Sequence, residues 1–177
     1  MTEFEKYQKD VDEFFRDDSP KIFGNYTQEH ASYVIHKLLE SAEKDIALLS
    51  GKYPCDFYKE DLEEDFERAI SRIAAAGGVV RVITADGQVS EQLQTLVKNF
   101  GGILEYRPAE YKGDKPISHF MVVDGKRYRL EHPHTVAEKT PESVAAEVCC
   151  NGESKAKDLL SFFDSVWHIL GDNETSK

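Results

Sequence analysis

The residues best able to do chemistry surround one apolar run, in the stretch ISHFMVVDGKRYRLE at positions 117–131. His119 precedes the run, Asp124 ends it, and Glu131 and His132 come after the chain has returned. Imidazole and carboxylate groups act as general acids and bases, and an imidazolium can also bind anions or sense pH. Two interpretations follow. The four residues form a reactive or ligand-binding centre, or they make local hydrogen bonds at strand ends.

A β-hairpin must position these residues. The segment HFMVV predicts one strand, Asp124-Gly125 a tight turn, and KRYRLE the returning strand. Between hydrophobic strands, a site is expected at the strand ends, where polar groups converge. The cations Lys126, Arg127 and Arg129 follow the turn. They form either the solvated face of the returning strand, which we favour, or a local basic patch.

The same region holds residue types that bind metals. His119, Glu131, His132 and His134 would suit zinc, but they lack the paired spacing of a zinc site. We therefore predict no metal and no cofactor. Cys149 lies in an apolar run and is predicted to belong to the core, while Cys150 would point to the opposite face with no base adjacent in sequence, so nothing signals a cysteine nucleophile. No glycine-rich phosphate loop is present.

Alternating helix and strand patterns lead up to the hairpin. Thr27 and Ser90 are predicted helix N-caps, and Asp61 can cap a third helix. Apolar strands are predicted in KIFGNY, KDIALLSGK, VVRVITA, ILEYRP and VAAEVCCN. Helices of this length between strands imply right-handed crossovers. The fold class is therefore α/β, with a mixed, mainly parallel sheet flanked by helices on both faces.

The two ends of the chain are predicted to lie outside the α/β domain. Residues 1–20 carry an amphipathic helix, which packs either on the domain's own core or on a partner. Residues 21–170 form the α/β domain, ending in a helix that contains FFDSVWHIL. Residues 171–177 are predicted to be a disordered tail.

Composition limits the function classes. The chain has 177 residues, enough for one domain with a real core, and a net charge of −11. That charge repels polyanions, which disfavours generic nucleic-acid binding. Three cysteines without paired spacing suggest a reducing cytoplasm. We find no signal peptide and no apolar run near the ~20 residues of a membrane span.

Three segments together resemble the phospholipase D-like superfamily. They are AEKDIALLSGKY, DFERAISRIAAAGGVVRVITAD, and HFMVVDGKRYRLE followed by AEVCCNGESKAKDLLSFFDSVW. The last contains the Phe-Asp-x-x-Trp-like ending of the family as FDSVW at positions 163–167. The resemblance covers roughly residues 25 to 170 and implies one half of a phospholipase D-like fold, with an extra N-terminal helix. It marks the chain as a degenerate member with a single motif.

The family motif is His-x-Lys-x-x-x-x-Asp followed by glycine and a hydroxyl residue. The resemblance places Asp124 on the motif aspartate, His119 on the lysine and Ile117 on the nucleophilic histidine. Glu131 takes the glycine position and His132 the hydroxyl position. Isoleucine has no nucleophilic atom, and Glu131 adds negative charge where a phosphate would be held. The register therefore predicts the loss of the family's hydrolysis.

Two functions remain open. The first is a catalytically degenerate binding, regulatory or scaffold module, which uses His119, Asp124 and Glu131 for a ligand or associates with a protein partner. Single-motif members pair face to face, which implies a homodimer through the face bearing Ile117, His119 and Glu131. The fold also serves as an effector-binding domain in some sugar-sensing transcription regulators. The second is a divergent phosphodiesterase or nuclease that uses His119, Asp124, Glu131 and His132.

Overall fold

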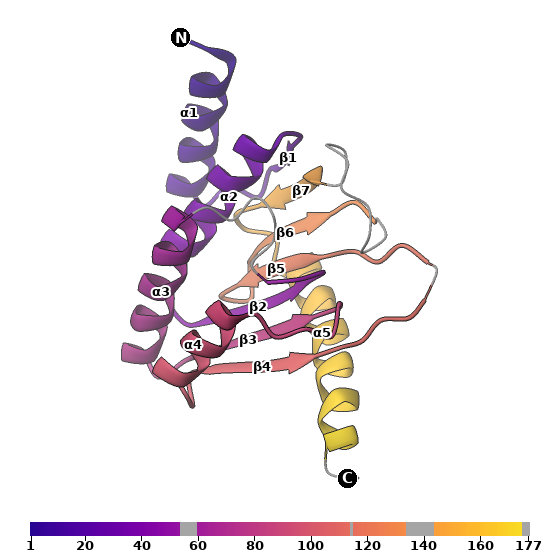
Figure 1. The fold of residues 1–177 in the computed structure, drawn as a ribbon. Coiled ribbons are helices and arrows are strands. Elements are labelled where there is room, and N and C mark those ends of the chain that lie inside the picture. The colour runs from indigo at the N-terminus through magenta and orange to yellow at the C-terminus, as the bar shows by residue number, and fades with distance from the viewer. Residues whose placement is uncertain (54–59, 114, 134–143, 175–177) are drawn as a thin grey trace.

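The computed structural model describes residues 1–53, 60–113, 115–133 and 144–174, which form an α/β fold around one seven-stranded sheet (Figure 1). The helices are α1 (Glu3–Arg16), α2 (Gln28–Ser41), α3 (Glu60–Ala75), α4 (Glu91–Asn99) and α5 (Glu153–Glu174). The strands are β1 (Ile22–Asn25), β2 (Asp45–Ser50), β3 (Val79–Thr84), β4 (Leu104–Pro108), β5 (Phe120–Val123), β6 (Arg127–Glu131) and β7 (Ala146–Cys149). The predicted α/β class is confirmed.

The strands lie in the order β1-β7-β6-β5-β2-β3-β4. Parallel pairing joins β2 to β3 and β3 to β4, while the other four neighbouring pairs are antiparallel. The sheet is mixed, as predicted, but parallel pairs are its minority and not its majority. The reason is that β2, β3 and β4 are joined by helical crossovers and lie side by side, whereas β1, which α2 connects to β2, lies at the far edge of the sheet and pairs with β7. After β4 the chain enters the centre of the sheet as the β5–β6 hairpin, whose strands pair antiparallel.

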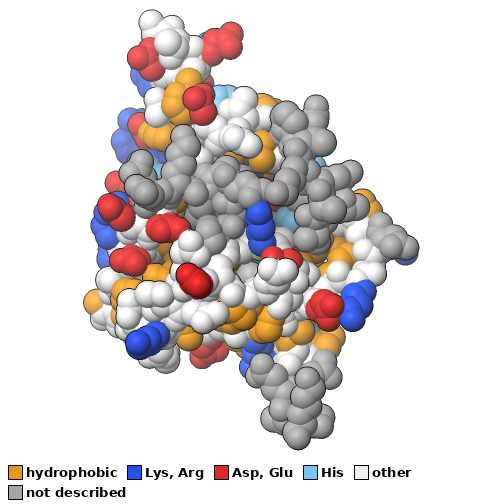
Figure 2. Space-filling view, in the orientation of Figure 1, with side chains coloured by type: hydrophobic (Ala, Val, Ile, Leu, Met, Phe, Trp, Pro, Cys, Tyr) orange, Lys and Arg blue, Asp and Glu red, His pale blue; other side chains and the backbone are white. Residues whose placement is uncertain are grey.

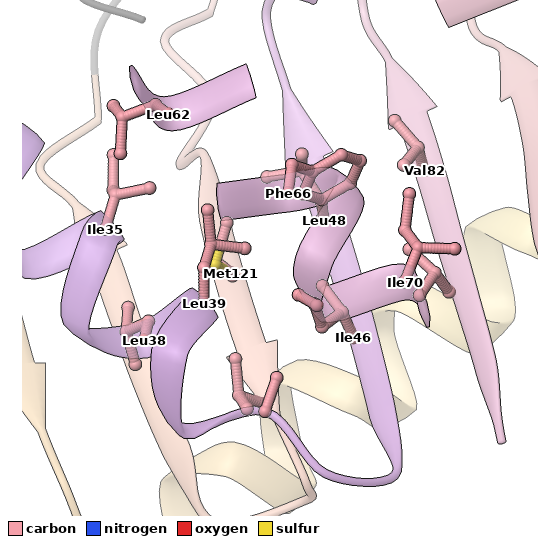
Figure 3. Close-up of a cluster of buried hydrophobic side chains, with 14 of the residues drawn as sticks. Ile35, Leu38, Leu39, Ile46, Leu48, Leu62, Phe66, Ile70, Val82 and Met121 are labelled. Atoms are coloured by element: carbon pink, nitrogen blue, oxygen red, sulfur yellow. The ribbon is translucent and has the colours of Figure 1, made fainter. Parts of the chain in front are cut away.

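Helices cover both faces of the sheet, as predicted. Helices α1 to α4 pack on one face and α5 on the other (Figure 1). Strand β2 is buried on both sides, with Leu48 directed to the first face and Leu49 to the second. Figure 3 shows Leu39 of α2 and Phe66 of α3 packed toward Leu48 and toward Met121 of β5. Full burial of one such side chain contributes about 1.5–3 kcal/mol.

Helix α1 packs on the core of its own chain, which settles one alternative left by the sequence. Val11 has no exposed surface and belongs to the same apolar cluster as α2 and α3. A capping box starts the helix, in which the Glu5 N–H donates to Thr2 Oγ1 at 3.1 Å and the Thr2 N–H donates to Glu5 Oε2 at 2.6 Å. The Tyr33 hydroxyl of α2 donates to Asp12 at 2.7 Å.

The β5–β6 turn forms where the sequence predicts it. Asp124 and Gly125 have φ values of 52° and 68°, and the Lys126 N–H donates to the Val123 carbonyl at 3.2 Å. Positive φ at both central residues matches the twist of the flanking strands. In β6, Tyr128 then faces α5, whereas its neighbours at positions 127 and 129 face the side covered by α1 to α4.

Helix α5 is held to the sheet by the residues of the FDSVW segment. Phe163 and Trp167 are buried, and the Arg81 side chain of β3 lies over both rings while donating to Asp164 at 2.7 Å. Arg107 of β4 also lies over Trp167. The helix continues to Glu174, so the tail predicted from position 171 begins with helix, and residues 175–177 lie outside the described residues.

Candidate functional site

The four candidate residues do not converge on one point. His119 precedes β5 and Asp124 follows it, so the two lie at opposite ends of the strand. At about 3.4 Å per residue, five residues of extended chain separate them by about 17 Å. His119 and Glu131 are neighbours, whereas Asp124 is remote from both. His119, Asp124 and Glu131 therefore do not lie together at one point, and their use in ligand binding stays a prediction.

Asp124 anchors the chain between α2 and β2. Its carboxylate accepts the backbone N–H groups of Lys44 at 2.7 Å, Asp45 at 3.1 Å and Glu43 at 3.1 Å. Arg127 donates to the same carboxylate at 3.3 Å. Hydrogen bonds from backbone N–H groups to an ionised carboxylate are strong. The observed role of Asp124 is thus to hold the start of β2, which is a structural role.

His119 and Glu131 face each other on adjacent strands. The Glu131 N–H donates to the His119 carbonyl at 2.8 Å, and His119 Nδ1 lies 3.2 Å from Glu131 Oε2. Each residue is only 7% exposed. The imidazole also lies against Gly51, where an added Cβ would be 3.0 Å from His119 Cε1. The absence of a side chain at position 51 is what admits the ring at the end of β2.

Arg129 connects this pair to the edge of the sheet. It donates through Nη1 to Glu131 Oε1 at 2.5 Å, through Nε to Asn25 Oδ1 at 2.9 Å, and through Nη2 to the Val144 carbonyl at 3.0 Å. Asn25 also donates to that carbonyl at 2.5 Å. We name Asn25, His119, Arg129 and Glu131 the buried polar network. Arg129 is 4% exposed and Asn25 fully buried, so charges removed from water are compensated by hydrogen bonds within the chain.

A small residue on β7 allows the network to span three strands. Ala146 pairs with Asn25 on one side and with Glu131 on the other. Its methyl group leaves room above β7, across which Arg129 reaches Asn25. The prediction that this face of β6 is solvated is therefore wrong at Arg129, because helices cover that side of the strand.

Helix α1 lies over the network through Tyr7. Burial raises the pKa of the Tyr7 phenol, and the nearby positive charge of Arg129 acts in the opposite direction. The Tyr7 ring stacks on His30 of α2 with 3.7 Å between the ring centroids. Within the described part of the chain, the Tyr7 hydroxyl and His30 Nδ1 are buried without a hydrogen-bond partner. Each such atom costs about 1–3 kcal/mol, so this contact between α1 and α2 is imperfect.

The remaining candidates lie outside the network. His132 is exposed and Ile117 is half-buried, while His134 falls outside the described residues. Lys126 and Arg127 pair with Asp18 at 2.6 and 3.5 Å, so no basic patch forms from these cations. His119 and Glu131 are buried within one chain, so these two side chains cannot form the partner-facing surface that the resemblance implied.

The buried thiols do not offer a nucleophile. Cys149 is in the core, as predicted, and burial raises the pKa of its thiol. Burial raises the pKa of Cys150 to about 12, so this thiol is protonated at neutral pH. Among residues 1–53, 60–113, 115–133 and 144–174, no group of His, Cys, Asp and Glu is arranged to hold a metal. None of the described helices is long and apolar enough to cross a membrane.

Comparison with known proteins gives matches of structure but not of sequence. No protein-family model matches the chain, and no curated protein matches it. TrmBL2, an archaeal chromatin protein with a novel mode of DNA binding, aligns at a TM-score of 0.61 and 15% identity. The alignment covers 94% of this chain but only 62% of TrmBL2.

Two smaller proteins match over nearly their whole length. Nuc from Salmonella typhimurium, a phospholipase D family member, aligns at a TM-score of 0.61 and 16% identity, covering 85% of this chain and 95% of Nuc. NucT from Helicobacter pylori aligns at 0.54 and 10% identity, covering 84% of this chain and 97% of NucT. At these identities the likeness is one of fold. The fold is phospholipase D-like, as the resemblance implied.

Proposed function

We propose that this chain is a non-catalytic phospholipase D-like domain that acts by binding, as a regulatory or scaffold module that self-associates or holds a protein partner. The observation that carries the proposal is the buried polar network. In the motif register, the lysine position (His119) and the glycine position (Glu131) are joined to each other at 3.2 Å inside the fold. Groups tied together in this way are poorly placed to hold a phosphate.

Two further observations support the proposal. Ile117 occupies the nucleophile position and has no atom that could attack phosphorus. Asp124 is engaged by backbone N–H groups at the other end of β5. The fold therefore keeps the motif residue that fastens the sheet, while the reactive pair is replaced. A net charge of −11 favours a protein partner over nucleic acid, and a reducing cytoplasm remains the proposed location.

The competing proposal is a divergent phosphodiesterase or nuclease that uses His119, Asp124, Glu131 and His132. The fold shared with Nuc, a phospholipase D family member, is the observation that favours it. The roughly 17 Å between His119 and Asp124 weighs against it, because general acid–base groups must reach the same substrate atom or a neighbouring one.

An activity assay separates the two proposals. Purified protein is incubated with bis(p-nitrophenyl) phosphate and with single-stranded DNA, with and without divalent cations. We expect no turnover above the buffer rate. Turnover that His119→Ala abolishes and His168→Ala leaves intact would establish the enzyme and remove the binding module. His168 is a suitable control because it is an exposed histidine on α5, away from the network.

A further inference from the structure

Strand β1 forms one edge of the sheet and carries little that would block pairing. Within the described residues the strand order ends at β1 on one side and at β4 on the other. Strand β4 ends in Pro108, and its Arg107 donates to the Trp167 carbonyl of α5. Strand β1, with the sequence IFGN, has neither proline nor charge. Open edges of this kind pair with other strands unless something prevents it.

The backbone groups of β1 that point outward can be identified from the ladder. The His132 N–H donates to the Ala145 carbonyl, so Ala145 and alternate residues after it bond toward β6. Ala146 and Val148 of β7 must then bond toward β1, where they pair with Asn25 and Phe23. The N–H and C=O groups at positions 22, 24 and 26 consequently face away from the sheet.

The side chains at these same positions form an apolar surface. Ile22 is 58% exposed and Tyr26 is 67% exposed. Gly24 lies between them on the same side of the strand, and an added Cβ there would lie 2.5 Å from the Tyr26 hydroxyl. The Tyr26 ring thus lies against position 24, and Ile22 lies on the same side of the strand, while Phe23 and Asn25 point into the fold.

We propose that β1 pairs antiparallel with β1 of a second copy, centred on Gly24, and joins the two sheets into one. This register is self-complementary. It places Gly24 opposite Gly24 of the second copy and Ile22 opposite its Tyr26, and those positions have the outward-facing backbone groups that the pairing requires. Cross-strand pairs of an aromatic with a β-branched residue are among the favourable ones.

Charge is compatible with this pairing. The register places Lys21 opposite Thr27 of the second copy, so no like charges meet along the strand. In the single chain, the Lys21 ammonium lies 4.9 Å from the centroid of the Phe14 ring, where it remains accessible to solvent. Each copy carries a net charge of −11, so added salt should strengthen association by screening the long-range repulsion.

The first test compares two identical substitutions in matched surroundings. Ile22→Lys places a charge on the β1 edge, and Ile169→Lys makes the same change on α5, where the isoleucine is 63% exposed. By sedimentation equilibrium at high micromolar concentration, we expect a wild-type dimer. Its dissociation constant should rise about tenfold in Ile22→Lys, which loses two symmetric cross-strand pairs, and stay unchanged in Ile169→Lys.

The second test reads the backbone directly. As protein concentration rises, amide hydrogen exchange should slow at Ile22, Gly24 and Tyr26, while Phe23 and Asn25, already bonded to β7, should not change. Two results would overturn the proposal. The first is a protein that stays monomeric at high concentration. The second is a dimer that Ile22→Lys leaves intact and in which the amides of Ile22, Gly24 and Tyr26 exchange as fast as in the monomer. The proposal would also be overturned if the amides of Ile22, Gly24 and Tyr26 became protected only when another protein is added, because β1 would then pair with a strand of that protein.

This inference rests on the self-association within the proposed function, and the two can fail separately. If Ile22→Lys is still a dimer, the proposed self-association stands and only the pairing through β1 is contradicted. Phosphodiester turnover removes the non-catalytic function without affecting the assembly result, because Ile22 and Gly24 take no part in the buried polar network.

Discussion

Asp124 and His119 flank one short strand, and the residues that surround each of them determine what it can do. Asp124 receives backbone N–H groups from the start of β2, so its carboxylate is used in holding two elements together. His119 is placed against Gly51 and Glu131 in the interior. These surroundings give Asp124 a structural role and place His119 inside the buried polar network.

Removal of the Asp124 carboxylate should destabilise the fold. Asp124→Ala deprives three backbone N–H groups and Arg127 of their acceptor, and it places alanine at a φ of 52°. We expect a loss of about 3 kcal/mol in the free energy of unfolding, measured by urea denaturation. Asp124→Asn should lose less, because asparagine keeps one acceptor and tolerates positive φ. Asp158→Ala, at an exposed position on α5, should change stability by less than about 0.5 kcal/mol.

The buried polar network makes a second prediction at the residue scale. Arg129→Met leaves the Glu131 carboxylate in the interior without its cation and should cost about 3–5 kcal/mol. The double variant Arg129→Met, Glu131→Leu removes both charges and should be more stable than the single variant. Urea denaturation of both proteins measures the difference. Equal stabilities would mean that the charge left on Glu131 carries no penalty.

Among the elements, local signals predicted the fold well. Thr27 and Ser90 cap α2 and α4 with hydrogen bonds of 3.1 Å, as their sequence context indicates. Asp124-Gly125 predicted the hairpin turn in the same way, because two adjacent residues that tolerate positive φ are enough to indicate such a turn. The pairing of strands distant in sequence had no comparable signal, and the share of parallel pairs was therefore overestimated.

The buried polar network could not be predicted, and the reason is physical. The alternation of Arg127, Tyr128 and Arg129 is typical of a strand with one solvated face. Whether that face meets water depends on helices elsewhere in the chain, and here Tyr7 of α1 lies near Arg129. Asn25 gave no signal at all, since its partner Arg129 lies far along the sequence.

The contact between α1 and α2 should respond to pH. Burial lowers the pKa of His30 from 6.5, and this effect outweighs the opposite influence of Glu29. As pH falls, the unfolded chain therefore takes up a proton on this residue before the folded chain does, so stability decreases from pH values around 6.5 downward. The contribution of neutral His30 to the stability of the fold is fully present above that pH.

A substitution isolates the contribution of His30. His30→Phe keeps a ring against Tyr7 but has no titratable group. The unfolding free energy of the wild type, followed by urea denaturation between about pH 5 and pH 8, should fall more steeply on acidification than that of His30→Phe. Parallel curves for the two proteins would show that His30 has the same pKa folded and unfolded.

Across the whole molecule, the surface charge differs from what the fold alone would indicate. The space-filling view shows acidic side chains scattered over the face that it presents, among basic and hydrophobic ones (Figure 2). TrmBL2 shares the fold and binds DNA, whereas this chain carries a net charge of −11. A shared fold does not by itself determine a ligand, because the surface chemistry of each chain influences what approaches it.

The pairing of β1 with β7 also bears on how the chain folds. The two strands of the β5–β6 hairpin are close in sequence, whereas Ile22 of β1 pairs with Cys149 of β7, which is separated from it by most of the chain. Closing so long a loop is slow and entropically costly, so we expect the β1 edge to dock after the centre of the sheet has formed. A newly synthesised copy would then complete the edge proposed for self-pairing only in its last folding step, which would delay intermolecular strand exchange until each core is complete.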